Sequence, residues 1–277
     1  MKTLLSIGHG YSAQALARVL LPQGWRIIGT TRSARTAAQI AATGVEPLIW
    51  PGEDLPFEQA THLLSSVAPD EAGDPVLRAC AGRIAAARFD WVGYLSTVGV
   101  YGDHDGGWVD EDTPPAPATE RGRARIAAEA AWSAVQPVHV FRLAGIYGPG
   151  RGPFAKVKAG TARRIVKPDQ VFSRIHVDDI AQVLAASIAA PHPGRLYNVC
   201  DDAPAPPEDV LAFAAELLHL PVPPAEDFAT ARMSPMARSF YAENKRVRND
   251  RIRQELGVRL LYPDYRVGLR ALALAGA

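Results

Sequence analysis

A glycine-rich turn near the amino terminus joins an apolar run to an amphipathic segment. Thr3–Ile7 is followed at once by Gly8-His9-Gly10-Tyr11-Ser12-Ala13, and residues 12–21 carry apolar side chains at helical spacing. Between a strand and a helix, the first glycine permits a tight turn and the second lets the backbone approach a pyrophosphate, while a small residue at Ala13 keeps the helix close to the sheet. We therefore predict a dinucleotide site at this turn, formed by Gly8, Gly10, Tyr11, Ser12 and Ala13.

Through the first two-thirds of the chain, short apolar runs alternate with amphipathic, Ala-rich segments. Most runs are apolar at every position, as strands must be when helices cover both faces of their sheet. This rhythm predicts an α/β fold with a doubly wound parallel sheet of the Rossmann type. The predicted strands are Thr3–Ile7, Trp25–Gly29, Val45–Trp50, His62–Val67, Phe89–Leu95 and Pro137–Leu143, and the predicted helices are Ser12–Leu21, Ala34–Ala42, Asp74–Ala87 and Arg121–Val135.

The pattern changes after Gly150. Residues 151–170 are basic and irregular, and the segments that follow, up to residue 199, have the pattern strand, helix, strand. We expect residues 1–150 to form the cofactor domain, completed by about 171–200, and residues 151–170 with 201–277 to form a small C-terminal α/β substrate lobe. The basic stretch Lys245–Arg253 is interpreted as a solvated helix edge, from which Arg248 or Arg251 could reach the cleft.

The composition excludes several classes of protein. The 277 residues include 30 Lys and Arg against 29 Asp and Glu, which gives a net charge of +1. A protein whose main partner is nucleic acid or an anionic membrane is expected to be more basic, so the charge balance argues against both partners. Cys80 and Cys200 cannot build a disulfide framework and are expected to be buried. The scattered histidines predict no metal site. No apolar run approaches about 18 residues, so we expect a soluble cytoplasmic protein.

The end of the second predicted strand bears on the choice of cofactor. A site that prefers NAD(H) places Asp or Glu there to accept from the ribose hydroxyls, whereas this chain has Thr30-Thr31-Arg32-Ser33. A guanidinium with neighbouring hydroxyls suits a 2′-phosphate, because Arg binds phosphate through a planar fork. We predict that Thr31 and Arg32 favour NADP(H) over NAD(H). A solvated Arg32 on an ordinary loop is the alternative.

Four further motifs resemble the extended short-chain dehydrogenase/reductases, the NAD-dependent epimerase/dehydratase-like branch. They are residues 94–102 (YLSTVGVYG), 141–151 (FRLAGIYGPGR), 174–181 (RIHVDDIA) and 197–199 (YNV), in that order along the chain. The resemblance covers nearly the whole length. The glycine turn and the Thr-Thr-Arg segment look most like the atypical members of that branch.

The resemblance implies roles for further residues. Ser65, Ser66 and Ser96 would line the cofactor, Leu143, Ala144 and Gly145 would flank its nicotinamide end, and Thr97 would hydrogen-bond the reacting oxygen. His176 is interpreted instead as a packed histidine at a strand end. Asp178 and Asp179 are interpreted as carboxylates that favour the dipole in a first helical turn.

The catalytic Tyr and Lys of this family, four residues apart after the fifth strand, are both replaced. In the matching segment 118–129 (ATERGRARIAAE), Arg121 takes the Tyr position and Arg125 the Lys position. Arginine has a pKa above about 12, so Arg121 cannot exchange a proton near neutral pH. Arg125 could still donate to ribose hydroxyls. We expect the helix face that both share to border the cleft and receive an anion, with Glu129 offsetting part of its charge. A solvated basic helix is the alternative.

Function stays open between two classes. The first is an NADP(H)-dependent oxidoreductase, epimerase or dehydratase whose proton-transfer residue has moved, with Tyr101, His104 and Tyr147 as candidates. The second is a non-catalytic NADP(H)-binding redox sensor or scaffold. In either case Thr97, Arg121 and Arg125 are the residues expected at the reacting centre. The expected partner is a small molecule, anionic if it meets the arginines, and both monomer and homodimer stay open.

Overall fold

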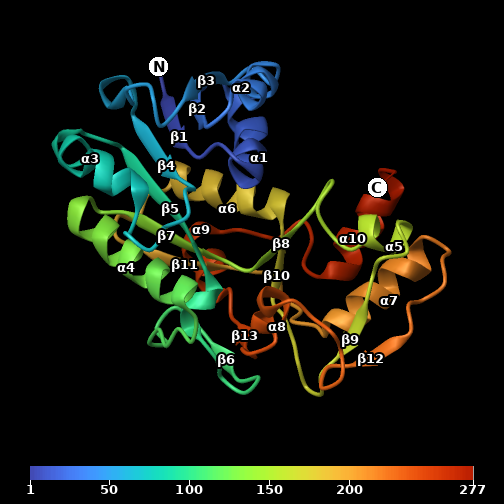
Figure 1. Cartoon of the computed structure of the whole chain (residues 1–277). Coiled ribbons are helices and arrows are strands. Elements are labelled where there is room, and N and C mark those ends of the chain that lie inside the picture. Colours follow the sequence, from blue (N-terminus) through green and yellow to red (C-terminus); the bar gives the residue numbers. More distant parts are fainter. Residues whose placement is uncertain (277) are drawn as a thin grey trace.

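The structure, a computed structural model, describes residues 1–276. Its main sheet has seven strands, β1 (Thr3–Ile7), β2 (Arg26–Thr31), β3 (Glu46–Ile49), β4 (His62–Ser65), β5 (Trp91–Thr97), β7 (His139–Leu143) and β11 (Leu196–Val199). Their order is β11-β7-β5-β4-β1-β2-β3, and all neighbours are parallel (Figure 1). The strand order runs outward from β1 to β3, and β4 then starts again on the other side of β1, as in doubly wound folds. The predicted fold class is confirmed.

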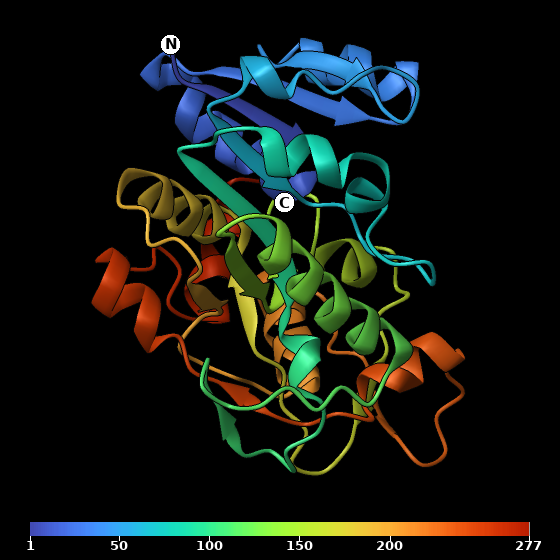
Figure 2. The same cartoon turned by 90° about the vertical axis from the view of Figure 1, so that its left-hand side faces the viewer.

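Helices cover both faces of this sheet. One layer contains α1 (Tyr11–Leu20), α2 (Ala34–Ala41) and α6 (Val177–Ala189), and the other contains α3 (Pro75–Ala86) and α4 (Glu120–Val135). Figure 2 shows α3 and α4 in front of the strands. Successive residues Leu4 and Leu5 enter opposite cores, because side chains alternate along a strand. The strand segments are therefore apolar at every position because a helical layer covers each face of the sheet.

A second, smaller core lies beside the sheet, to the right in Figure 1. Tyr147, Phe154, Val210, Tyr265 and Leu269 are among its buried residues. Within residues 1–276, no helix is both long and apolar enough to cross a lipid bilayer. The elements of this lobe are α5 (Phe154–Lys158), β9 (Arg164–Val166), α7 (Pro207–Leu217), β12 (Ala225–Asp227), α8 (Pro235–Phe240) and α10 (Tyr265–Leu274), and short 3-10 helices elsewhere are η1 (Leu21–Gln23), η2 (Phe57–Gln59) and η3 (Val98–Tyr101).

Two small parallel pairs link the lobe to the sheet domain. β8 (Gly145–Tyr147), which was not predicted as a strand, pairs with β10 (Arg174–His176). β13 (Arg246–Val247) pairs with β6 (Trp108–Val109), and α9 (Asp250–Leu256) follows. The interpretation of Lys245–Arg253 as one solvated helix edge is therefore wrong, because it holds a strand and then a helix. Val247 and Ile252 are buried in the core beneath the sheet.

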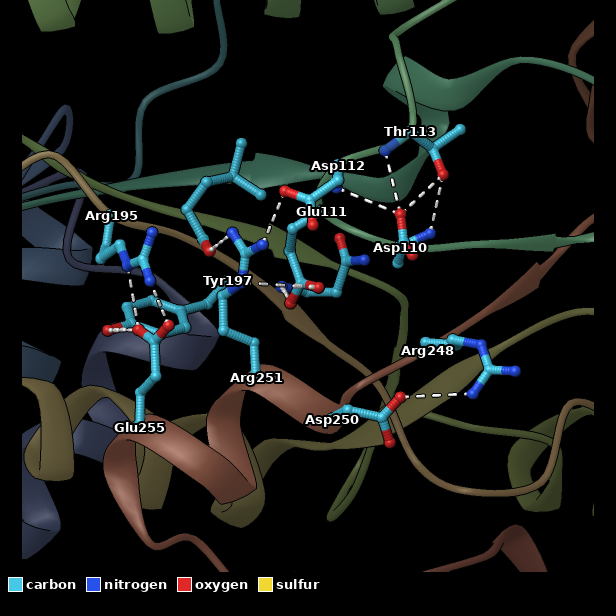
Figure 3. Close-up of polar contacts among 12 residues, drawn as sticks. Asp110, Glu111, Asp112, Thr113, Arg195, Tyr197, Arg248, Asp250, Arg251 and Glu255 are labelled. Atoms are coloured by element: carbon cyan, nitrogen blue, oxygen red, sulfur yellow. Dashed lines mark hydrogen bonds and ion pairs between the residues drawn. The ribbon is translucent and has the colours of Figure 1, made fainter.

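Arg251 fastens α9 to the edge of the sheet (Figure 3). Its Nη2 donates to Asp112 Oδ1 at 2.8 Å and its Nη1 to the Leu196 carbonyl at 3.3 Å. Arg248 is exposed, with its Nη1 3.4 Å from Asp250 Oδ2. Neither arginine lines the cleft described below, so the expectation that one of them reaches it is wrong.

Candidate functional site

The glycine turn between β1 and α1 is held by the neighbouring strand β2. Gly8 has φ +76°, a conformation that glycine adopts without strain, and its N–H donates to Thr30 Oγ1 at 2.8 Å. The His9 N–H donates to the Thr30 carbonyl at 2.9 Å. Two hydrogen bonds to one residue thus fix the turn in place, and the helix begins directly after it.

The start of α1 carries amide groups that no protein atom caps. Gly10 is the N-cap residue and supplies no side-chain hydrogen bond, so the N–H groups of Tyr11, Ser12 and Ala13 lack partners within the helix. Such a helix start attracts anions through free donors and the helix dipole. The Tyr11 hydroxyl donates to the Pro149 carbonyl at 2.9 Å and thereby ties this end to the segment after β8.

His9 supports the turn from the inside. Its side chain is buried against Gly29, and its Nδ1 lies 3.0 Å from Ser6 Oγ. Burial lowers the pKa of His9 to about 4, so the ring is neutral near pH 7. The neutral ring packs beneath the turn and supports it, and it adds no charge where a cofactor phosphate would bind.

Polar groups follow the neighbouring strands at the same edge of the sheet. Ser65 ends β4 and Ser66 follows it, and their buried hydroxyls find no hydrogen-bond partner among the described residues. Thr31 ends β2 and Arg32 follows it. Arg32 is exposed and forms no hydrogen bond or ion pair within residues 1–276. These are groups with unused hydrogen-bonding capacity, as a site for a polar ligand requires.

A cleft of about 1050 Å³ runs from the start of α1 across the carboxyl ends of the strands into the small lobe. Thr31, Arg32 and Ser65 do not line it, and of these Ser65 directly precedes a residue that does, Ser66. The predicted site residues that line it are Gly8, Gly10, Tyr11, Ser12, Ala13, Ser66, Ser96, Thr97, Arg121, Arg125, Leu143, Ala144 and Gly145.

Ser96 and Thr97 end β5 and use their hydroxyls differently. Ser96 donates to Glu129, which is buried and accepts from Arg142 Nε at 3.2 Å and Nη2 at 2.7 Å. Thr97 Oγ1 accepts from the Gly99 N–H at 3.1 Å, so its own O–H proton stays available to a ligand. The expectation that Glu129 offsets the Arg121 and Arg125 charges is wrong, because Glu129 pairs with Arg142 instead.

Arg121 and Arg125 both line the cleft, as their spacing on α4 predicts. Arg121 is exposed and has no hydrogen-bond or ion-pair partner within the described chain. Arg125 is partly buried, and its Nη1 donates to the Tyr94 hydroxyl and the Leu95 carbonyl, each at 2.9 Å. Burial raises the pKa of Tyr94 to about 12. Tyr94 therefore stays protonated and serves Arg125 as an acceptor.

The other residues weighed for proton transfer have structural partners. Tyr101 is buried and donates to Asn198 Oδ1 at 2.7 Å, and His104 Nε2 lies 3.1 Å from the Tyr101 carbonyl. Tyr147 lines the cleft, but burial raises its pKa far above the ordinary value. His176 is buried, accepts from the Asp178 N–H at 3.2 Å and packs on the Tyr262 ring, which confirms its interpretation as a packed histidine.

Three cationic residues of the cleft, Arg151, Arg174 and Lys245, were missed by sequence reasoning. Lys245 is buried, and its Nζ donates to the Gly102 carbonyl and to Glu243 Oε2, each at 2.7 Å. Arg174 lies in the small-lobe half of the cleft, near Phe172 and Tyr265. Arg174 belongs to a motif that the sequence made conspicuous, but only its pairing with β8 turns it toward the cleft. Lys245 lies in the basic stretch and gave no signal of its own.

The strand order, the uncapped start of α1 and the cleft across the strand ends define a Rossmann-type protein of the short-chain dehydrogenase/reductase class. No protein-family model matches the chain. A solved structure from Methylobacillus flagellatus, assigned as an NAD-dependent epimerase/dehydratase, is 30% identical, with a TM-score of 0.77 over 99% of this chain and 98% of that one. The chain belongs to the NAD-dependent epimerase/dehydratase family.

Two further proteins are similar over nearly their whole length. A conserved protein of unknown function from Silicibacter pomeroyi DSS is 65% identical, with a TM-score of 0.97 over 99% of each chain. Protein YeeZ of Escherichia coli K12 is 29% identical, over 95% of this chain and 97% of YeeZ.

Proposed function

We propose that the protein is an NADP(H)-dependent oxidoreductase or epimerase/dehydratase-type enzyme that moves its proton without the family's Tyr and Lys. The observation that carries the proposal is a single continuous cleft. The uncapped start of α1 opens into one half of it, and residues of the small lobe, including Val210 and Tyr265, wall the other half. One half suits a dinucleotide and the other leaves room for a small substrate.

The residues of the first half fit the cofactor. The free N–H groups of Tyr11, Ser12 and Ala13 would hold the pyrophosphate, and the unpartnered hydroxyl of Ser66 would meet its polar backbone. Arg32 supports NADP(H), because its guanidinium is free to pair with a 2′-phosphate and no carboxylate takes its place at the end of β2. The Methylobacillus relative is described as NAD-dependent, so the preference for NADP(H) rests on Arg32 in this chain.

When bound, the nicotinamide would donate or accept a hydride. Thr97 would donate its free O–H to a substrate oxygen, and Arg121 would stabilise negative charge that develops there, since its guanidinium has no other partner. Arg125 is held toward Tyr94 through Nη1 and would offer its remaining N–H groups to the ribose. None of the three loses a proton in these roles, so the proton that a carbonyl oxygen takes up after hydride transfer would come from water in the cleft.

A non-catalytic NADP(H) sensor is the second candidate, and Arg121 is the observation that favours it. A residue at the Tyr position that cannot exchange a proton would leave binding intact and remove the family's usual chemistry. A panel of aldehydes, 2-oxo acids and ketones, incubated with NADPH, separates the two. Turnover that Thr97→Val reduces at least about tenfold supports the enzyme, whereas NADPH binding without any oxidation supports the sensor.

Calorimetric titration tests the cofactor. The wild type is expected to bind NADPH more tightly than NADH, and Arg32→Glu should weaken NADPH alone by about tenfold or more, the loss of one charged hydrogen-bonding partner. Arg35→Glu is the matched control, because Arg35 is also exposed, three residues further on, within α2. Equal affinities for both nucleotides, or equal effects of the two substitutions, would remove Arg32 from the site.

A further inference from the structure

Arg174 occupies the wall of the small-lobe half of the cleft. It is paired in register with Gly145 across the β10–β8 ladder, and its Cγ would be in van der Waals contact, at 3.8 Å, with a Cβ at Gly145. Its Nη1 donates to the Phe172 carbonyl at 2.8 Å and to the Ala205 carbonyl at 3.0 Å. These contacts hold one nitrogen of the guanidinium, Nη1, and leave Nε and Nη2 for other partners.

The other edge of the Arg174 guanidinium has no partner in the described protein. Nε and Nη2 form no hydrogen bond within residues 1–276, and neither is closed off from solvent. No carboxylate of the described chain lies within ion-pair distance of Arg174, and burial lowers the pKa of its guanidinium below the ordinary value. A largely desolvated charge without a counter-ion, with two parallel donors unpaired, is the arrangement that a bidentate anion completes.

The surroundings select the kind of anion. Phe172, Val210, Tyr265 and Leu269 line this half of the cleft with apolar and aromatic surface. Burial raises the pKa of the neighbouring Asp201 to about 8, so that carboxyl is mostly protonated at neutral pH and does not cancel the Arg174 charge. A single guanidinium matches one carboxylate. The other cations that line the cleft outside α4 have contacts of their own, because Arg151 lies over the Tyr11 ring and Lys245 pairs with Glu243.

We propose that Arg174 binds the carboxylate of a small substrate whose apolar or aromatic body lies against Phe172 and Tyr265. This inference rests on the proposed function, because it names the substrate class for the second half of the same cleft. Gly145, the register partner of Arg174, belongs to the segment expected at the nicotinamide end. A carboxylate on Arg174 would therefore hold a substrate next to that segment.

Three probes with the same benzyl body test the proposal by calorimetry on the full chain saturated with NADPH. They are phenylacetate, its neutral isostere phenylacetamide, and benzylphosphonate. Phenylacetate is expected to bind at least about tenfold more tightly than phenylacetamide, and benzylphosphonate more weakly than phenylacetate. Tighter binding of the phosphonate would replace the carboxylate with a phosphate as the recognised group, and equal binding of acid and amide would overturn the proposal.

Substitution locates the effect at Arg174. Arg174→Gln keeps an N–H donor for the Phe172 and Ala205 carbonyls, and should weaken phenylacetate about tenfold while leaving the affinity for NADPH within about twofold. Arg270→Gln, on the exposed side of α10, is the matched control and should change neither. Retained NADPH binding shows that the variant is folded, so an unchanged phenylacetate affinity overturns the inference alone. If the wild type does not bind NADPH, that result contradicts the proposed function instead.

Discussion

Arg142 and Glu129 form a buried ion pair beneath the cleft, with Arg142 Nη2 2.7 Å from Glu129 Oε2 and Nε 3.2 Å from Oε1. The pair joins β7 to α4, and the Ser96 hydroxyl donates to the same carboxylate. Arg125 lies one turn before Glu129 on α4, so the pair also fixes the helix that carries the cationic face of the cleft. Its geometry is bidentate, which gives the pair direction as well as charge.

Glu129→Gln should destabilise the protein by about 3–5 kcal/mol, because Arg142 would keep a buried charge without a counter-ion. Urea unfolding measures the change, and Arg142→Met combined with Glu129→Gln should recover part of it. The exposed pair Arg26–Glu46, also bidentate, supplies the control, and Glu46→Gln should cost less than about 1 kcal/mol. Equal costs for the two substitutions would show that burial of the Arg142 pair does not decide its contribution.

Gly29→Ala should disturb the glycine turn from behind. A Cβ at Gly29 would lie 2.7 Å from His9 Cγ and 2.9 Å from Val45 Cγ1, both packed positions. Overpacking of this kind costs about 1–3 kcal/mol, and displacement of His9 should also weaken NADPH binding.

Gly82→Ala is the matched control for Gly29→Ala, since a Cβ at Gly82, inside α3, meets nothing within 4 Å. It should leave NADPH binding unchanged and stabilise the protein by up to about 1 kcal/mol, because alanine is the better helix residue. Thermal unfolding and NADPH titration of both variants decide the matter. A Gly29→Ala variant that behaves like Gly82→Ala would mean that the turn adapts.

Much of this fold could be predicted from local patterns in the sequence. The runs around Leu4 and Leu5 are apolar because each residue faces its own helical layer, and Gly8 and Gly10 stand where the turn needs them. Cys80 and Cys200 are buried, as predicted. These features depend on local periodicity and on backbone conformation, which neighbouring residues determine.

The cationic residues of the cleft could not be assigned in the same way. Lys245 and Arg251 share one basic stretch, yet Lys245, directly before β13, lines the cleft, whereas α9 carries Arg251 to Asp112. Glu129 follows Arg125 by one turn, but its partner is Arg142 on a strand. Which cation meets which acid depends on long-range pairing of β13 with β6 and of α4 with β7, and no spacing along the chain encodes these contacts.

Arg121→Tyr should increase carbonyl reduction if the Tyr position still faces the reacting centre. Arg121 has no partner to lose, so the substitution should cost little stability, and a tyrosine can donate the proton that arginine holds too tightly. General acid catalysis of this kind typically contributes about 10²–10⁴-fold, so a gain of at least about tenfold in NADPH oxidation with phenylpyruvate is expected. Arg123→Tyr, on the same helix but outside the cleft, is the control. Equal rates in both variants would place proton transfer elsewhere.

Asp201 should make stability fall as the pH rises. Its side chain is buried, Oδ2 has no hydrogen-bond partner among the described residues, and burial raises its pKa to about 8. An unfolded aspartate has a pKa near about 3.9, so between these values the folded protein holds a proton that the unfolded chain has lost. The free energy of unfolding then decreases with rising pH in that window, by up to about 1.4 kcal/mol per pH unit from this one group.

Asp201→Asn removes this contribution, so its stability relative to the wild type should grow from pH 5 to pH 8, as measured by urea unfolding at each pH. Asp209→Asn, at an exposed carboxylate of α7, should instead run parallel to the wild type. A constant difference between Asp201→Asn and the wild type across this range would mean that Asp201 is already ionised in the fold, and that its charge then offsets that of Arg174.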